Sequence, residues 1–358
     1  MNDYIIKNLW EAQFHTVNKN IDKKHQSITN DAKKIKFEKF LKKYRNWHRH
    51  DDIGSPYQFN FYSLKKHGFL NFLKYTLQVN FFNFPYTSTS KQRNFFFDDL
   101  EIIKLINSYD ILVNCPVHQS PGNNIAYFIN KDISANVRWL RYIYFTGVLR
   151  NYFKDIENPK FIVDIGSFYG GFQYVMKKTF SKSKNVLVDF PHQLARSAIF
   201  LTKAFPESKI FAIYNQQTLN QYYENANKDY DFLFITNEKF NEFSERFDFT
   251  LQKIDLVTNF ASLGEMNKES FKMYIDSKIM NNSKTTYFYN RYDSSPFYEK
   301  TFQEKTTIFD YLLKNHKVVL NRNSGIHAYQ MPLRKLFGQK KSRPTSSGYF
   351  DLIQTKID

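Results

Sequence analysis

The spacing of hydrophobic residues changes near Asn158-Pro159. After this point short apolar runs alternate with amphipathic stretches, which predicts βαβ units and a mostly parallel sheet. The apolar runs that predict strands are 160–166, 185–190, 209–215, 231–237, 253–260, 284–292 and 317–323. Apolar residues at helical spacing predict helices over 170–181, 191–205 and 267–280. We therefore expect a doubly wound, Rossmann-like α/β domain.

Three stretches before this domain also have the spacing of helices. Residues 33–50 form a basic amphipathic pattern, which suits a solvated helix face, and residues 67–82 are dense in apolar side chains, as in a buried helix. A third helical pattern follows Asp132 and Ser134, either of which could cap it. Residues 114–124 contain two prolines and a glycine, and therefore predict a loop.

These patterns divide the 358 residues into three parts. We expect a mainly α-helical N-terminal region over residues 1–150, which would recognise the acceptor or act as a lid. The α/β domain follows over residues 151–335. Residues 336–358 are basic and then rich in serine, which predicts a flexible C-terminal tail.

Composition narrows the class of protein. Aromatic residues make up 18% of the chain, which is too much apolar surface for a disordered protein even though 24% of residues are charged. Neither a membrane span of roughly 20 apolar residues nor a secretory signal is visible, so we expect a cytoplasmic protein. The single cysteine, Cys115, excludes an internal disulfide and a cysteine-rich zinc site. No metal-binding motif occurs, and we expect no tightly bound metal.

The net charge of +17 has two interpretations. A basic face is typical of proteins that bind phosphates. However, the basic residues are scattered except at 33–43 and 334–343, and Lys, Asn, Phe, Tyr and Ile are abundant together, as a codon bias toward A and T would produce. We favour codon bias and expect no specific nucleic-acid partner. Anionic sugar nucleotides and peripheral contact with a membrane surface stay open as alternatives.

A glycine-rich turn follows the first predicted strand of the α/β domain. The strand ends in Asp164 and Gly166, and Gly170-Gly171 opens the next helix. Glycines let a ligand approach the backbone closely, and a helix N-terminus offers unpaired N–H groups. A nucleotide-like ligand fits such a turn. The residues that we expect to line it are Asp164, Gly166, Ser167, Tyr169, Gly170 and Gly171.

The second predicted strand ends in Asp189, about 20 residues past the turn, where a carboxylate can accept hydrogen bonds from both ribose hydroxyls. Asp189 and Phe190 would then bind an adenosine. The turn departs from the G-x-G-x-x-G of NAD sites, because Phe168 stands in place of a glycine. S-adenosylmethionine sites have an acidic residue two before the first glycine, facing the methionine ammonium group. Asp164 occupies that place, so we expect S-adenosylmethionine as the cofactor.

Three segments, taken in order, resemble a family of bacterial sugar O-methyltransferases. Asp164–Gly171 matches D/E-I-G-x-x-Y-G-G, Val188–Pro191 contains D-x-P, and Asp255–Met266 matches D-L-V-x-N-x-x-S-x-x-E-M. The resemblance covers roughly half the chain. It implies transfer of a methyl group from S-adenosylmethionine to a hydroxyl of a sugar or glycan, in surface-polysaccharide or lipopolysaccharide synthesis. His192 and Gly264 depart from the residues usual in the family, an acidic residue and a glutamine.

Methyl transfer to a hydroxyl needs aligned reactants and a base that removes the proton. The segment after the strand 253–260 lies at the carboxyl edge of the sheet, where such folds bind ligands. Glu265 in this segment is the first candidate base, and an early-helix carboxylate beside the helix dipole is the alternative. His192 is a second candidate, with a surface histidine as the alternative.

Four further residues are candidates for ligand binding. Asn259 would contact the cofactor, and Ser262 the acceptor. Asn290 and Arg291 end a predicted strand and could bind acceptor hydroxyls or a phosphate. The alternative for this pair is an exposed strand end with a solvated arginine.

Two other functional classes stay open as alternatives. A nucleic-acid methyltransferase would suit the charge, but Asn259-Phe-Ala-Ser lacks the N/D-P-P-Y/F of amino-methylating DNA enzymes, and Cys115-Pro116 reverses the Pro-Cys of cytosine C5 enzymes. A non-catalytic protein that binds S-adenosylmethionine or a nucleotide is the third class, and Phe168 in place of glycine leaves it open.

Overall fold

The computed structural model describes residues 2–15, 36–45, 89–115, 126–130, 133–224, 229–294, 305–326 and 348–357. The chain forms two compact units. Unit 1 comprises Met1–Arg45, Asn158–Ser324 and Ser347–Asp358, and unit 2 comprises Asn46–Glu157 and Gly325–Ser346. The first 45 residues therefore belong with the α/β sheet, and not, as expected, with the rest of residues 1–150.

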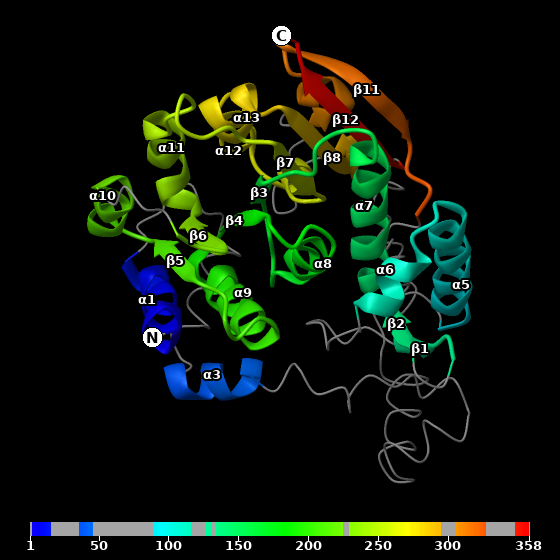
Figure 1. The fold of residues 1–358 in the computed structure, drawn as a ribbon, viewed down its shortest axis with the longest axis horizontal. Helices are drawn as coiled ribbons and strands as arrows, with labels where there is room; N and C mark the ends of the chain where they lie inside the picture. The colour runs from blue at the N-terminus through cyan, green and yellow to red at the C-terminus, as the bar shows by residue number, and fades with distance from the viewer. Residues whose placement is uncertain are drawn as a thin grey trace, which may run out of the picture. The chain divides into compact units, whose positions relative to one another are not determined.

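An eight-stranded sheet with the order β11-β12-β8-β7-β3-β4-β6-β5 forms the centre of unit 1 (Figure 1). Its strands are β3 (Phe161–Ile165), β4 (Lys184–Asp189), β5 (Ile210–Ile213), β6 (Phe232–Thr236), β7 (Leu256–Phe260), β8 (Thr285–Arg291), β11 (His316–Asn323) and β12 (Tyr349–Lys356). The strands from β5 to β8 are parallel, whereas β12 pairs antiparallel with both β8 and β11. Every predicted strand is present, and the predicted α/β fold is confirmed.

Helices pack against the sheet in two groups. On one side α9 (Pro191–Ala204) contacts α8 (Gly171–Thr179), α1 (Asn2–His15) and α3 (Phe37–Arg45). In the other group α11 (Asn237–Arg246) contacts α10 (Gln216–Glu224) and α13 (Lys278–Asn282), and α13 contacts α12 (Lys268–Ile275). The two groups follow from right-handed crossovers that run first toward β5 and then back toward β8.

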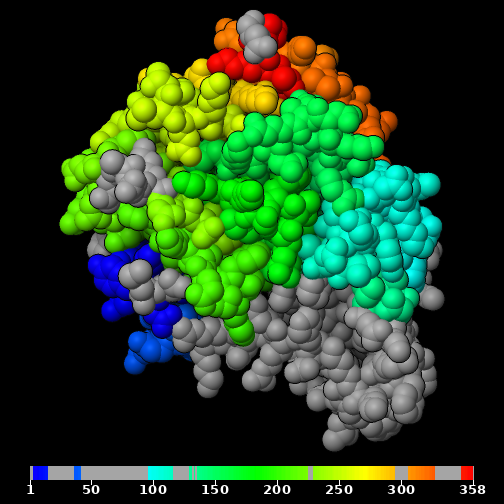
Figure 2. Space-filling model, in the orientation of Figure 1, coloured from blue at the N-terminus to red at the C-terminus, as the bar shows by residue number. Residues whose placement is uncertain are grey.

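Two of the predicted helices have different bounds in the structure. The stretch 267–280 forms α12 and α13 rather than one helix, because Ser277 caps α13 by accepting a hydrogen bond from the Met280 N–H. Within the basic pattern 33–50, α3 spans Phe37–Arg45. Its Phe40 stacks on Trp10 of α1 at 4.1 Å between ring centroids, and Figure 2 shows both helices in blue beside α9.

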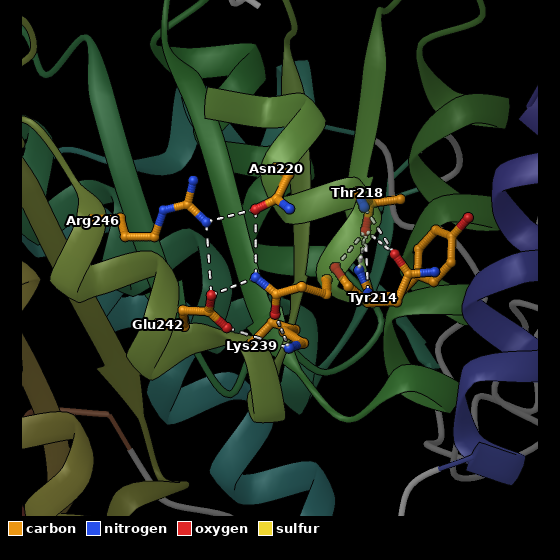
Figure 3. Close-up of polar contacts among 8 residues, drawn as sticks. Tyr214, Thr218, Asn220, Lys239, Glu242 and Arg246 are labelled. Carbon is orange, nitrogen blue, oxygen red and sulfur yellow. Dashed lines mark hydrogen bonds and ion pairs between the residues drawn. The ribbon is translucent and has the colours of Figure 1, made fainter. Parts of the chain in front are cut away.

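A polar network on the surface of unit 1 joins α10 to α11 (Figure 3). The Arg246 Nη1 donates to Asn220 Oδ1 at 2.8 Å, and the Gln216 Nε2 donates to Glu242 Oε1 at 2.6 Å. Lys239 Nζ donates to Gln216 Oε1 at 2.8 Å. These bonds fix the position of α11 on α10.

Unit 2 contains three described helices, α5 (Thr89–Leu105), α6 (Tyr109–Asn114) and α7 (Val137–Phe153), and a hairpin of β1 (Ala126–Phe128) and β2 (Ser134–Asn136). α7 packs on α5 and α6. It is capped by Asn136, whose Oδ1 accepts from the Trp139 N–H at 2.8 Å, and not by Asp132 or Ser134. Cys115 is buried, and its carbonyl accepts from the Trp139 indole. The predicted helix 67–82 lies outside the described residues.

Among the described helices of both units, none is long and apolar enough to cross a membrane.

The strand β12 corrects the expectation of a flexible tail over residues 336–358. Phe350 and Leu352 are fully buried in the main hydrophobic cluster of unit 1. Between them Asp351 is also buried, where it accepts from the Tyr287 hydroxyl at 2.8 Å and lies 3.4 Å from the Arg322 Nε. The strand was not predicted because a basic, serine-rich stretch precedes Tyr349 and because the charged Asp351 interrupts the apolar residues of the strand. Residues 336–347 lie outside the described part of the chain.

We expect Leu352→Ala to lower the free energy of unfolding by about 2–5 kcal/mol, because it leaves a cavity in the core. Urea unfolding followed by circular dichroism measures this. Ile357→Ala is the matched control, since Ile357 is 56% exposed and should shift the value by less than about 0.5 kcal/mol. Equal behaviour of the two variants would contradict a structural role for β12.

Candidate functional site

The candidate site lies where the order of the strands reverses. From β3 the chain moves to β4 on one side, and it later returns to place β7 on the other side of β3. Open α/β sheets bind ligands outside the carboxyl ends of their strands at such a point. The segment after β3 and the segment after β7 meet here, because Asp164 pairs with Thr258 and Ile165 with Asn259 in the register of the two strands.

The turn after β3 depends on Gly166. Its φ is +78°, a conformation that side chains disfavour, and its N–H donates to the Val188 carbonyl at 2.8 Å. A Cβ at this position would overlap the Ser262 side chain, so space as well as conformation requires glycine. The segments after β3 and β7 are therefore packed directly against each other.

Phe168 takes over the role of the missing glycine in this turn. Its φ is +54°, so it keeps a left-handed conformation that costs roughly 1–3 kcal/mol. Two hydrogen bonds hold it there: its N–H donates to Asp189 Oδ2 at 2.7 Å, and its carbonyl accepts from the Ser197 hydroxyl at 2.7 Å. The neighbouring Tyr169 is fully buried against Phe200 of α9. The turn keeps its shape although the middle glycine is absent.

Asp164 lies buried beneath the turn. Its carboxylate accepts from the Thr258 hydroxyl at 2.6 Å and from the Gln173 amide. Burial raises the pKa of Asp164 to about 7, and these two hydrogen bonds oppose the rise. Sequence reasoning missed Thr258 and Gln173, since only the pairing of β3 with β7 and the first turn of α8 bring them to Asp164.

Asp189 is half-buried at the end of β4 and joins the turn to the start of α9. Its Oδ2 accepts from the Phe168 N–H and its Oδ1 from the Phe190 N–H, each at 2.7 Å. Burial raises the pKa of Asp189 to about 7, opposed by the same backbone hydrogen bonds. Each carboxylate oxygen has a further lone pair, which can accept from a ligand hydroxyl.

His192 lies in the first turn of α9, beside Asp189 in the chain. It is only 7% exposed and its ring stacks on Phe190 at 5.9 Å between centroids. The interpretation of His192 as a surface histidine is therefore wrong. The structure associates it with the Asp189 side of the site, and Glu265 with the other side.

A network of three predicted site residues links β3, β7 and β8. Asn259 Nδ2 donates to the Ile165 carbonyl at 2.6 Å and to Ser262 Oγ at 2.5 Å. Its Oδ1 accepts from Asn290 Nδ2 at 2.9 Å. Asn259 and Asn290 are buried, so the alternative of an exposed strand end is wrong for Asn290. The polar atoms of Asn259 bind protein groups and hold the end of β3 in place.

Glu265 and Arg291 form an ion pair at the end of β8. Glu265 Oε1 lies 3.6 Å from Arg291 Nη2, and Arg291 Nε donates to the Tyr349 hydroxyl at 3.0 Å. Glu265 ends a short 3₁₀ helix, Leu263–Glu265, and α12 starts only at Lys268 with Asn267 as its cap. Glu265 therefore lies before α12 rather than in its first turn, and the positive charge that faces it is the guanidinium of Arg291.

Several buried polar atoms at the carboxyl edge of the sheet have no hydrogen-bond partner among the described residues. Within the described residues these include Ser167 Oγ, Thr236 Oγ1 and Asn237 Oδ1. Thr236 is only 1% exposed and pairs with Asp189 in the register of β6 and β4. Such atoms are rare unless a ligand or water satisfies them. Sequence reasoning missed Thr236 and Asn237, although two polar residues at the end of a predicted apolar strand are a signal for a ligand site.

No group of three or more His, Cys, Asp or Glu side chains in the described ranges is arranged to hold a metal ion.

No protein-family model matches the chain, and no curated protein matches it. Similar solved structures include a small RNA methyltransferase with 12% identity and a TM-score of 0.34. The alignment covers 67% of this chain and 27% of that protein. Others are the plantazolicin methyltransferase crystallised with a triazolic desmethylPZN analogue and S-adenosylhomocysteine, and an S-adenosylmethionine-dependent methyltransferase from Anabaena variabilis. All three are methyltransferases.

The last two similarities are of the same size. The plantazolicin enzyme has 12% identity and a TM-score of 0.30, with 62% of this chain and 85% of the other covered. The Anabaena enzyme has 9% identity and a TM-score of 0.35, with 59% and 83% covered. Similarities of this size establish neither the cofactor nor the substrate of this chain.

We expect Gly166→Ala to lower the free energy of unfolding by about 2 kcal/mol or more, because the new Cβ meets Ser262 and φ is positive. Chemical denaturation measures the change. Gly348→Ala is the control, since no atom lies within 4 Å of a Cβ built there. Adding Ser262→Gly to Gly166→Ala should restore the part that comes from the overlap, and no recovery would contradict the packing described here.

Proposed function

We propose that this chain is an S-adenosylmethionine-dependent O-methyltransferase that acts on a hydroxyl of a sugar or glycan. The observation that carries the cofactor is the carboxylate of Asp189, fixed by the N–H groups of Phe168 and Phe190 at the reversal point of the sheet. A carboxylate held in this way can accept from the two hydroxyls of a ribose.

The other groups around the turn fit the same cofactor. Ser167, Thr236 and Asn237 each offer a buried polar atom that lacks a partner among the described residues. Ser167 follows β3. Thr236 ends β6, the strand next to Asp189, and Asn237 comes directly after it, so a nucleoside bound to Asp189 would extend between Ser167 and these two residues. This match supports a polar, adenosine-like ligand.

The turn favours a sulfonium cofactor over NAD. In NAD sites the second glycine lets the backbone approach the pyrophosphate. Phe168 occupies that place here, and its left-handed backbone is held by bonds to Asp189 and Ser197. S-adenosylmethionine has no pyrophosphate, and when bound it supplies an activated methyl group.

The residues on the other side of the site would handle the acceptor. We assign Glu265 as the base that removes the hydroxyl proton, since it lies at the carboxyl edge and is partly exposed. Arg291 would bind the acceptor, and Ser262, Asn259 and Asn290 would keep the end of β3 in position. His192, stacked on Phe190, would shape the adenosine side rather than act as a base.

The sugar acceptor is supported by the resemblance of three segments to sugar O-methyltransferases. These segments are Asp164–Gly171, Val188–Pro191 and Asp255–Met266. They contain the carboxyl ends of three adjacent strands, β3, β4 and β7, and the residues after them. They therefore meet at one edge, as residues of a shared site must. The net charge of +17 is the observation that favours a nucleic-acid acceptor instead.

We expect S-adenosylhomocysteine, but not NAD, to bind in a calorimetric titration, with Asp189→Ala weakening it at least tenfold. Because the pKa of Asp189 is raised to about 7, its carboxylate forms as the pH rises from 6 to 8, and affinity should rise by about tenfold over this window. Asp229→Ala is the control, since Asp229 is an exposed partner of Lys209. Absence of S-adenosylhomocysteine binding would rule out the cofactor.

We expect loss of the gene to remove one methyl increment from one sugar of the cell's polysaccharide, measured by mass spectrometry. Restoring the gene with Glu265→Gln should not bring the increment back, because the base is absent. Unchanged glycans, together with RNA binding that weakens steeply with salt, would instead favour a nucleic-acid methyltransferase.

A further inference from the structure

Arg291 is held from one side by aromatic side chains of the sheet. Its Nε donates to the Tyr349 hydroxyl at 3.0 Å, and its guanidinium lies 5.6 Å from the centre of the Tyr349 ring. Tyr349 pairs with Arg291 in the register of β12 and β8 and stacks on Tyr289 at 4.8 Å between centroids. The guanidinium is therefore positioned by strands rather than by a loop.

The other four N–H groups of the Arg291 guanidinium donate no hydrogen bond within the described part of the chain. A guanidinium has five N–H donors in a planar fork, and only the Nε–H of Arg291 makes a hydrogen bond there. The carboxylate of Glu265 lies 3.6 Å from Nη2, which is longer than a hydrogen bond. The side chains of Arg291 and Glu265 are 26% and 41% exposed. Ion pairs exposed in this way contribute little stability, so this pair can separate easily.

Residues close to the ion pair in the chain contact the turn after β3. Asn290, next to Arg291, donates to Asn259, which donates to the Ile165 carbonyl just before Gly166. Glu265 follows Ser262, which also receives a hydrogen bond from Asn259. An acceptor that reaches Arg291 would therefore lie beside the residues that position the cofactor turn.

We propose that the acceptor carries an oxyanion, a phosphate or a carboxylate, and that this group replaces Glu265 on Arg291. A planar fork binds an oxyanion with two parallel hydrogen bonds, which is stronger than the present contact with Glu265. The exchange releases Glu265 to act as the base, so that only a charged acceptor prepares the site. This inference rests on the proposed function and names the class of its acceptor.

The methyl transfer needs no reactant besides the acceptor, the cofactor and Glu265. The acceptor oxygen gives its proton to the Glu265 carboxylate as it forms a bond to the methyl carbon, while the sulfonium sulfur keeps the electron pair of the broken bond. Arg291 stays paired with the oxyanion throughout. Glu265 is a catalytic residue in this scheme, and Arg291 is a binding residue that controls it.

The test is a calorimetric titration of the full chain, saturated with S-adenosylhomocysteine, at constant ionic strength. The probes are inorganic pyrophosphate, glucuronate and the neutral methyl glucoside. We expect at least one of the two oxyanions to bind at least tenfold tighter than the neutral sugar. Arg291→Met should abolish this difference, and Arg291→Lys should keep only part of it because an ammonium lacks the fork.

Glu265→Gln gives the sharpest result. If Glu265 competes with the oxyanion for Arg291, its removal should tighten oxyanion binding severalfold, whereas a purely structural ion pair predicts no gain. Arg246 and Glu242 supply matched controls, since they form an ion pair at 3.7 Å (Figure 3). Like Arg291, Arg246 also lies beside an aromatic ring, at 4.4 Å from the centre of Tyr223. Arg246→Met and Glu242→Gln should leave oxyanion binding unchanged.

Two outcomes overturn the proposal: no oxyanion binds more tightly than the neutral sugar, or binding does not depend on Arg291 and Glu265. Either result, with S-adenosylhomocysteine still bound, leaves the proposed cofactor standing. Failure to bind S-adenosylhomocysteine would instead remove the proposed function. A short RNA that binds through Arg291 more tightly than pyrophosphate would support the oxyanion and overturn the sugar acceptor.

Discussion

The carboxylate of Asp189 binds two stretches of backbone, and the Ser197 hydroxyl of α9 supports the first of them. One is the left-handed Phe168 in the turn after β3, and the other is Phe190, where α9 begins. Without these acceptors, a bulky residue at positive φ would relax toward an ordinary conformation. The turn, the start of α8 and the start of α9 all follow from this arrangement, and so does the row of polar atoms that a nucleoside would meet.

Features that depend on neighbouring residues could be predicted from the sequence. The strands β3 to β8 are short apolar runs, and glycine at Gly166 and Gly170 has the positive φ that a tight turn requires. The positions of Asp164, two residues before the first glycine of the turn, and of Asp189, at the end of the next strand, could be predicted from their spacing in the sequence alone. For these reasons the sheet and the glycine turn after β3 could largely be predicted from the sequence.

Features that depend on distant partners could not be predicted in this way. β12 is a strand because β8 and β11 lie on either side of it, and its buried Asp351 is tolerated because Tyr287 and Arg322 meet it. Asn259 was expected to face the cofactor, but its amide lies between Ile165 and Asn290, a contact that only the strand order creates. Thr258 and Thr236 are ordinary strand residues until register places them beside Asp164 and Asp189.

The position of β12 also has a consequence for the order of assembly during synthesis. β8 and β11 are made before Tyr349–Lys356, yet β11 joins the sheet only through β12, as their pairing shows. Until that segment leaves the ribosome, the edge of β8 is an open template of N–H and C=O groups. The nascent chain must keep this edge from other strands. Arg291 also lacks its tyrosine support during that interval, so the Glu265–Arg291 part of the candidate site is completed later than the turn after β3.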